Sequence, residues 1–158
     1  MLIGIADANH VSMFDVGADI LINPVNCIGI MGGGLALEFK LRFPQMFKDY
    51  QDVCAKGFRP GMLHTYHEAG KIIFNVPTKN DLSDSTKTIV RTSLAGLLVS
   101  LVAMRPMLSG AKIAMPALGC GLGNMEWEGE HGIKDMLVRF CTDQLLDDYQ
   151  FLMFTPKG

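Results

Sequence analysis

The stretch Asn23-Pro24-Val25-Asn26-Cys27-Ile28-Gly29-Ile30-Met31-Gly32-Gly33-Gly34 joins an expected strand, residues 19–23, to an expected helix through three consecutive glycines. After it, apolar side chains recur at helical spacing until Pro44. Glycines at the start of a helix let the backbone approach a ligand closely. The free N–H groups and the dipole of the first helical turn attract negative charge. The pattern therefore predicts a phosphate site.

A second glycine-rich loop, Pro116-Ala117-Leu118-Gly119-Cys120-Gly121-Leu122-Gly123-Asn124, follows an apolar strand expected at residues 112–117. Alternating glycines can form a backbone nest for an anion, and two such nests suit a diphosphate. The P-loop motif is absent, because Leu35 and not lysine follows Gly34. The dinucleotide fingerprint fails as well, because Leu37 and Asn124 occupy its third glycine position. For either loop alone, a tight turn or close helix packing explains the glycines as well as a phosphate site does.

The remaining apolar patterns alternate between strand and helix types. Strands are expected at residues 2–5, 62–67, 71–76 and 149–154, and helices at 44–54, 90–102 and 133–141. This order predicts a mixed sheet between helical layers, of the α/β class. Ligands of such sheets bind beyond the carboxyl ends of the strands, where both glycine-rich loops are expected.

The composition indicates one domain over residues 1–158, because the chain has 158 residues of which 49% are hydrophobic. The net charge of −2 gives no general attraction to nucleic acid or to anionic membranes. The first residues lack a signal-peptide pattern, and the apolar run 94–104 is too short to span a bilayer. None of the four cysteines stands in a C-x-x-C pair. We expect a cytoplasmic monomer without metal, disulfide or membrane contact.

The motifs together resemble the macro domain family over nearly the whole chain. The resemblance rests on Asn23-x-x-Asn26, on the glycine triplet that opens a helix, and on Pro116-x-x-Gly119-x-Gly121 after a late strand. Asn75-Val76-Pro77-Thr78-Lys79, the first loop, and the second loop followed by Trp127 resemble the branch of DarG-type DNA ADP-ribosyl glycohydrolases and terminal ADP-ribose glycohydrolase. The resemblance implies a three-layer α/β/α sandwich with a mixed central sheet, ADP-ribose as ligand, and no cofactor.

The resemblance also implies site residues. Asp7 matches the residue that hydrogen-bonds the adenine, and Asn26 matches the residue that faces the distal ribose. The diphosphate would be held by the two loops, at Gly32, Gly33, Gly34 and Leu35 and at Gly119, Cys120, Gly121, Leu122, Gly123 and Asn124. The alternative interpretations are a turn aspartate for Asp7 and a loop-capping asparagine for Asn26.

Lys79 matches the proposed catalytic lysine of the branch, which acts on the anomeric carbon of the distal ribose, in some schemes through a covalent adduct. A nucleophilic amine must be partly neutral, so burial or a nearby positive charge should lower its pKa. Outside the motif, a loop lysine is simply solvated. Three features depart from the family pattern. Ala6-Asp7-Ala8 stands in place of the usual Gly-Asp-Ile, Gly33 stands where bacterial relatives often have lysine, and Gly123 stands where some have aspartate.

Three functions follow from the resemblance. The first is a hydrolase that removes ADP-ribose from a modified macromolecule, with DNA ahead of protein. The second is a reader that binds ADP-ribose without turnover, and the third is a phosphatase of ADP-ribose 1″-phosphate. Whether the chain works with a toxin partner stays open.

Other polar residues carry weaker signals. Lys79 favours the hydrolase, whereas the net charge weakens the case for DNA. A basic surface for nucleic acid is one interpretation of Lys40, Arg42, Lys48, Lys56 and Arg59, and a solvated helix surface is the other. His64 and His67 lie three apart on a strand and face opposite sides, so we expect no shared metal there. Cys120 is expected to be an inert, packed thiol.

Overall fold

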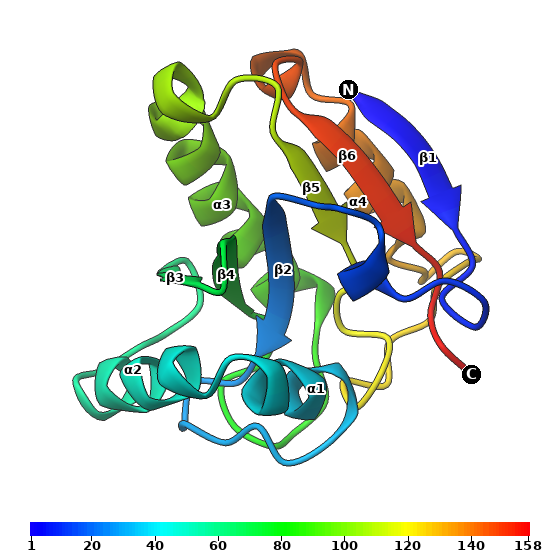
Figure 1. The fold of residues 1–158 in the computed structure, drawn as a ribbon. Helices are drawn as coiled ribbons and strands as arrows, with labels where there is room; N and C mark the ends of the chain where they lie inside the picture. The colour runs from blue at the N-terminus through cyan, green and yellow to red at the C-terminus, as the bar shows by residue number, and fades with distance from the viewer.

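A single six-stranded sheet runs through the computed structural model, which describes residues 1–158 (Figure 1). Its strands lie in the order β1-β6-β5-β2-β4-β3, and all neighbours are parallel except β3, which pairs antiparallel with β4. The strand bounds are β1 Leu2–Ala6, β2 Ile20–Val25, β3 His64–Glu68, β4 Lys71–Pro77, β5 Lys112–Met115 and β6 Gln150–Phe154. The expected mixed sheet is therefore confirmed.

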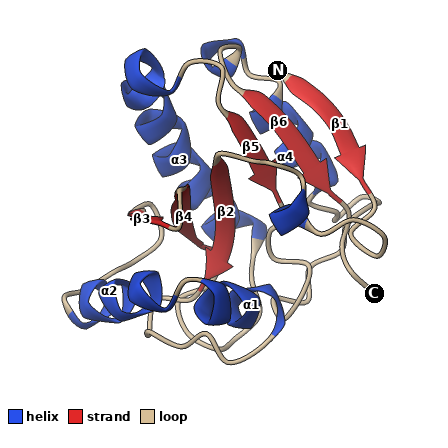
Figure 2. Ribbon diagram, viewed as in Figure 1, coloured by secondary structure: helices blue, strands red, loops and turns tan.

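Helices cover both faces of the sheet (Figure 2). The helices α1 (Gly34–Arg42) and α2 (Pro44–Ala55) pack on one face, and α3 (Lys87–Leu108) and α4 (Lys134–Cys141) pack on the other. Pro44 is the first residue of α2, as its position in the sequence indicated. The three-layer α/β/α sandwich is thus confirmed.

Alternation along the strands divides the core into two clusters. In β2, Ile20 and Ile22 point to the side of α3 and α4, whereas Leu21 points to the side of α1 and α2. β4 repeats this pattern with Phe74 and Ile73. These central strands are buried on both faces, which explains why their sequences read as continuous apolar runs.

Some expected boundaries were wrong. The strand expected at 112–117 ends at Met115, so Pro116 and Ala117 already belong to the second loop. α3 begins earlier than expected, because the Thr86 side chain accepts a hydrogen bond from the amide of Ile89 and caps the helix. A short 3₁₀ helix at Met13–Asp15 was not expected, because three residues leave no periodicity to detect.

α3 is 22 residues long and, by length and composition alone, apolar enough to cross a membrane. This differs from the sequence-based interpretation, which considered only residues 94–104. One stripe of the helix, formed by Val90, Leu94, Leu97 and Leu101, packs into the larger core cluster against the sheet. Its apolar character is therefore explained by its place in the core.

Candidate functional site

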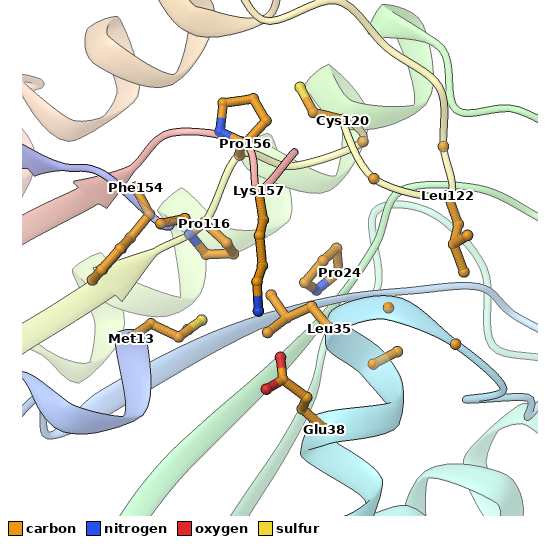
Figure 3. Close-up of a pocket in the computed structure, with 18 of the residues that line it drawn as sticks. Met13, Pro24, Leu35, Glu38, Pro116, Cys120, Leu122, Phe154, Pro156 and Lys157 are labelled. Atoms are coloured by element: carbon orange, nitrogen blue, oxygen red, sulfur yellow. The ribbon is translucent and has the colours of Figure 1, made fainter. Parts of the chain in front are cut away.

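A cleft of about 1060 Å³ opens at the carboxyl ends of the parallel strands (Figure 3). Several chain segments line it. They are residues 8–15, the end of β2 at Pro24–Asn26, the first glycine loop with the start of α1, Thr78 and Lys79 after β4, Pro116, Ala117 and Gly119 to Gly123 after β5, and Phe154 to Lys157 at and after β6. The two glycine loops thus meet in one cavity, as the topology predicted.

The first loop approaches the second at Leu122. A Cβ atom placed on Gly33 would lie 3.2 Å from Leu122 Cδ1, and one on Gly34 would lie 3.6 Å from Leu122 Cγ. Gly34 also has a φ of +56°, a conformation that disfavours other residues. Because Gly33 caps α1 without a side chain, the amide groups of the first helical turn remain available to an anion.

Asn26 lies in the cleft wall, but its side chain already serves the first loop. Its Oδ1 accepts hydrogen bonds from the amides of Ile28 (3.1 Å) and Ile30 (3.4 Å), and its Nδ2 donates to the Ile30 carbonyl (2.8 Å). The hydroxyl of buried Tyr50, from α2, lies 2.8 Å from both the backbone oxygen and Oδ1 of Asn26. The loop-capping alternative therefore describes what Asn26 does in this structure, and its contact with the distal ribose stays a prediction.

Lys79 is half-buried in the cleft wall, with its Nζ 3.5 Å from the carbonyl oxygen of Leu122. Its own segment is tied to the first loop, because the Cys27 amide donates to the Asn80 carbonyl at 3.1 Å. The side chain and amide of Ser83 hold the pKa of Asp81 below its ordinary value, and Lys79 adds a smaller effect. A carboxylate, that of Asp81, is thus a charged neighbour of Lys79.

The second loop is tightly packed where it leaves the cleft. A Cβ on Gly123 would lie 2.3 Å from Ser85 Oγ and 2.5 Å from the Gly119 oxygen, so no side chain fits at the position where some relatives carry aspartate. Burial raises the pKa of the Cys120 thiol to about 11, so the thiol is neutral at ordinary pH. Asn124, with φ of +59°, donates to Asp84 at 2.8 Å and does not line the cleft.

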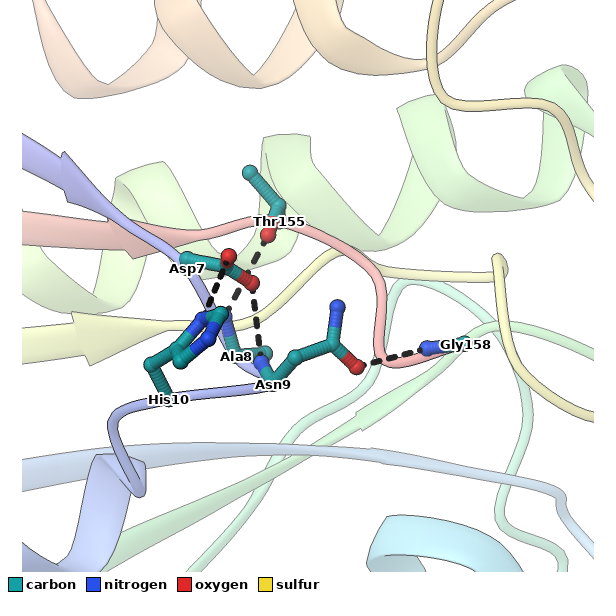
Figure 4. A network of polar contacts seen from close by, with 6 residues as sticks. All are labelled: Asp7, Ala8, Asn9, His10, Thr155 and Gly158. Atoms are coloured by element: carbon teal, nitrogen blue, oxygen red, sulfur yellow. Dashed lines mark hydrogen bonds and ion pairs between the residues drawn. The ribbon is translucent and has the colours of Figure 1, made fainter.

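Asp7 also lies outside the cleft lining and shapes the segment that follows it (Figure 4). Its Oδ1 accepts from the Asn9 amide at 2.9 Å, and its Oδ2 lies 2.8 Å from His10 Nδ1. The Asn9 amide and the His10 ring together lower the pKa of Asp7. The turn interpretation fits these contacts, and a direct contact of Asp7 with adenine stays a prediction.

Some cleft residues had no clear sequence signal. Met13 and Phe14 reach the cleft from the unexpected 3₁₀ helix, Glu38 reaches it from α1, and Leu82 and Lys157 reach it from loops. A serine two residues before Phe14 caps that 3₁₀ helix, and this was the only local hint. The other residues are brought to the cleft by the tertiary fold.

A buried polar chain lies beneath the site, which corrects the interpretation of His64 as an ordinary strand residue. His64 is 4% exposed, its Nε2 lies 2.6 Å from Asp49 Oδ2, and its Nδ1 lies 2.8 Å from Asn75 Nδ2. Asn75 Oδ1 in turn accepts from Asn23 Nδ2 at 2.9 Å. These hydrogen bonds therefore connect the strands β2 and β4, from which the first loop and the Lys79 segment emerge. His67 is exposed on the opposite face, as expected.

Comparison with known proteins agrees with this geometry. The macro domain family model matches residues 22–133. The DNA ADP-ribosyl glycohydrolase of Mycobacterium tuberculosis is 34% identical over 145 residues, which cover 89% of this chain and 39% of that protein. Its counterpart from Thermus aquaticus is 30% identical over 122 residues, which cover 73% of this chain and 33% of that protein. The chain thus spans two fifths or less of the length of these relatives.

Solved structures give the same result. The macrodomain of Mycobacterium tuberculosis DarG superposes with a TM-score of 0.83 at 29% identity, covering 97% of this chain and 98% of that one. The structure of Thermosipho africanus DarTG in complex with ADP-ribose gives a TM-score of 0.77 at 26% identity, covering 92% of this chain and 40% of that one. The family model covers more than half of the chain, and the chain belongs to the macro domain family.

Proposed function

We propose that this domain is an ADP-ribosyl glycohydrolase that releases ADP-ribose from modified DNA. The observation that carries the proposal is the meeting of Lys79 with both glycine loops in one cleft. Relatives at 30–34% identity are DNA ADP-ribosyl glycohydrolases, which supports DNA as the macromolecule. We further propose that residues 1–158 form a single domain that works as a cytoplasmic monomer.

The cleft offers a distinct environment to each part of ADP-ribose. The apolar end around Met13 and Phe154 suits the adenine. The amides near Gly33 and Gly121 suit the diphosphate. The distal ribose then falls beside Lys79, with its anomeric carbon toward the open rim where the macromolecule enters.

Lys79 is assigned to the chemistry at the anomeric carbon. When the glycosidic bond breaks, its electron pair goes to the leaving base, water supplies the new bond to carbon, and a proton from that water reaches the base. Because the carboxylate of Asp81 is a charged neighbour of Lys79, we assign Lys79 the role of a positioned cation that stabilises charge on the leaving atom. A nucleophilic amine is the alternative role, and trapping a covalent adduct would distinguish the two.

The test is single-turnover release of ADP-ribose from an ADP-ribosylated oligonucleotide and from an ADP-ribosylated protein. Lys79→Ala should lower the rate about 100-fold or more while calorimetry shows ADP-ribose binding within about threefold of wild type. Lys87→Ala is the matched control, because Lys87 Nζ also lies 3.5 Å from a carbonyl, that of Glu130, outside the cleft. Its rate should equal that of wild type.

Other outcomes would contradict parts of the proposal. Equal rates for Lys79→Ala and wild type would remove Lys79 from the mechanism. If the ADP-ribosylated protein is turned over faster than the oligonucleotide, modified protein and not DNA is the target. Tight binding of ADP-ribose by wild type without turnover of either substrate would instead favour a reader. Release of phosphate from ADP-ribose 1″-phosphate would favour the phosphatase, an activity named for a yeast protein that is 51% identical over 39 residues, 25% of this chain.

A further inference from the structure

Glu38 is an acidic side chain in a cleft that we assign to a dianionic ligand. It lies on α1, four residues after Gly34, and lines the cleft. Its carboxylate makes no hydrogen bond or ion pair within the protein, although it is only partly exposed. A carboxylate close to the diphosphate would oppose binding, so its place in the cleft calls for a polar partner on the ligand.

Lys157 faces Glu38 from the opposite wall. It follows β6, and in Figure 3 its side chain crosses the cleft with the amino group toward the Glu38 carboxylate. The tail that carries it is anchored, because the Thr155 hydroxyl accepts from the Ala8 amide at 3.3 Å and the Gly158 amide donates to Asn9 Oδ1 at 3.1 Å. The two opposite charges give the pair no net charge. The Glu38 carboxylate itself stays free to accept hydrogen bonds from neutral hydroxyls.

The position of this pair along the cleft identifies the part of the ligand that it meets. Met13 and Phe154 lie on one side of Glu38 and Lys157, and Cys120 and Leu122 of the second loop lie on the other (Figure 3). If the apolar end holds adenine and the glycine loops hold the diphosphate, the group between them is the ribose attached to adenine. Its two adjacent hydroxyls are the donors that a carboxylate binds well.

We propose that Glu38 binds the free 2′- and 3′-hydroxyls of this proximal ribose and thereby excludes ligands that carry a 2′-phosphate. A 2′-phosphate would remove one donor and set two negative charges against the carboxylate. Nucleotide sites in other folds use an acidic residue against the ribose in the same way. The inference rests on the proposed function, since it assumes that ADP-ribose occupies the cleft.

The experiment measures the Kd of ADP-ribose and of ADP-ribose 2′-phosphate by calorimetry and compares their ratio. Wild type should bind ADP-ribose at least about tenfold more tightly. Glu38→Gln removes the charge and one of the two acceptor oxygens, so it should weaken ADP-ribose binding about tenfold and reduce that ratio to about one. Lys157→Gln should move the ratio in the opposite direction, because it removes the nearby positive charge. Glu130→Gln, an exposed acid outside the cleft, is the control and should leave the ratio unchanged.

Two results would overturn the inference while the proposed function stands. One is that wild type binds ADP-ribose and ADP-ribose 2′-phosphate with equal affinity. The other is that Glu38→Gln has the same ratio of Kd values for the two ligands as wild type. Failure of wild type to bind ADP-ribose at all would instead overturn the proposed function.

Discussion

Gly33 gives the sharpest test at the scale of a single residue. Its φ of −164° is ordinary extended backbone, and the atom that a new Cβ would approach is the flexible end of Leu122, so the fold should tolerate a side chain. Gly33→Glu would place a negative group between the two loops, where the diphosphate should lie. We expect calorimetry to detect no ADP-ribose binding, while the free energy of unfolding stays within about 1 kcal/mol of wild type.

Gly33→Ala separates bulk from charge and should retain measurable binding. Normal binding by Gly33→Glu would mean that the first loop does not contact the phosphates. Loss of the folded state in Gly33→Glu would show that the space beside Leu122 cannot open.

The placement of residues in the cleft was predictable where it depends on backbone position and not where it depends on packing. The glycines of both loops and Lys79 gather in the cleft because they follow the carboxyl ends of parallel strands. The engagement of Asn26 depends on Tyr50, which reaches it from α2, 24 residues later in the chain. Glu38 has the sequence context of a solvated helix residue, and only the fold turns it toward the cleft.

At the scale of elements, α2 supports the first loop through Tyr50. Tyr50 is fully buried, and its hydroxyl meets Asn26 at 2.8 Å. Tyr50→Phe removes this donor and leaves the backbone carbonyl of Asn26 without its partner, so the free energy of unfolding should fall by about 1–3 kcal/mol. ADP-ribose binding should also weaken, because the loop loses its support. Urea denaturation and calorimetry would measure the two effects.

Tyr66→Phe is the matched control for that variant, because the Tyr66 hydroxyl forms no hydrogen bond within the protein and lies on β3. It should leave both quantities unchanged. A Tyr50→Phe variant as stable as wild type, with normal binding, would show that α2 does not hold the loop.

Long elements were predictable from periodicity, and their ends depended on capping and proline. The two-sided burial of β2 and β4 produces apolar runs that identify them as strands. β5 is only four residues long, so its end at Met115 was placed two residues too late. The 3₁₀ helix at Met13–Asp15 has a local capping serine but no repeat, and it contributes three cleft residues that the sequence did not reveal.

At the scale of the whole molecule, charge limits how the domain can hold DNA. The chain has 14 Lys and Arg against 16 Asp and Glu, and two basic side chains of α1 already stack on aromatic rings, Arg42 at 4.2 Å from Phe14 and Lys40 at 4.6 Å from Phe47. Few phosphate contacts are therefore available, and turnover of an ADP-ribosylated oligonucleotide should fall only shallowly with rising salt. The measurement is kcat/KM between low and high salt, and a steep decline would reveal a basic surface that these contacts do not account for.

The stability of the whole molecule should decline on the alkaline side because of buried thiols. Burial raises the pKa of Cys141 to about 12, and that of Cys27 to about 11 with a smaller contribution from Cys54, whereas an ordinary thiol titrates near 9.0. Above about pH 9 the unfolded chain loses these protons and the folded chain keeps them. Ionisation then favours the unfolded state, so the free energy of unfolding should be level below that pH and fall as the pH rises toward the folded values.

Cys141 provides the variant that tests this sign, because it is the last residue of α4 and is fully buried in the core. Urea denaturation in reductant at pH 7 to 10 should show one cooperative transition, as one continuous sheet requires. Between pH 9 and 10, Cys141→Ala should reduce the loss of unfolding free energy by up to about 1.4 kcal/mol per pH unit. Leu137→Ala, from the same core, should be destabilised at every pH but should keep the wild-type slope, because it removes packing and no titrating group. If Cys141→Ala keeps that slope too, the alkaline loss of stability arises from other groups.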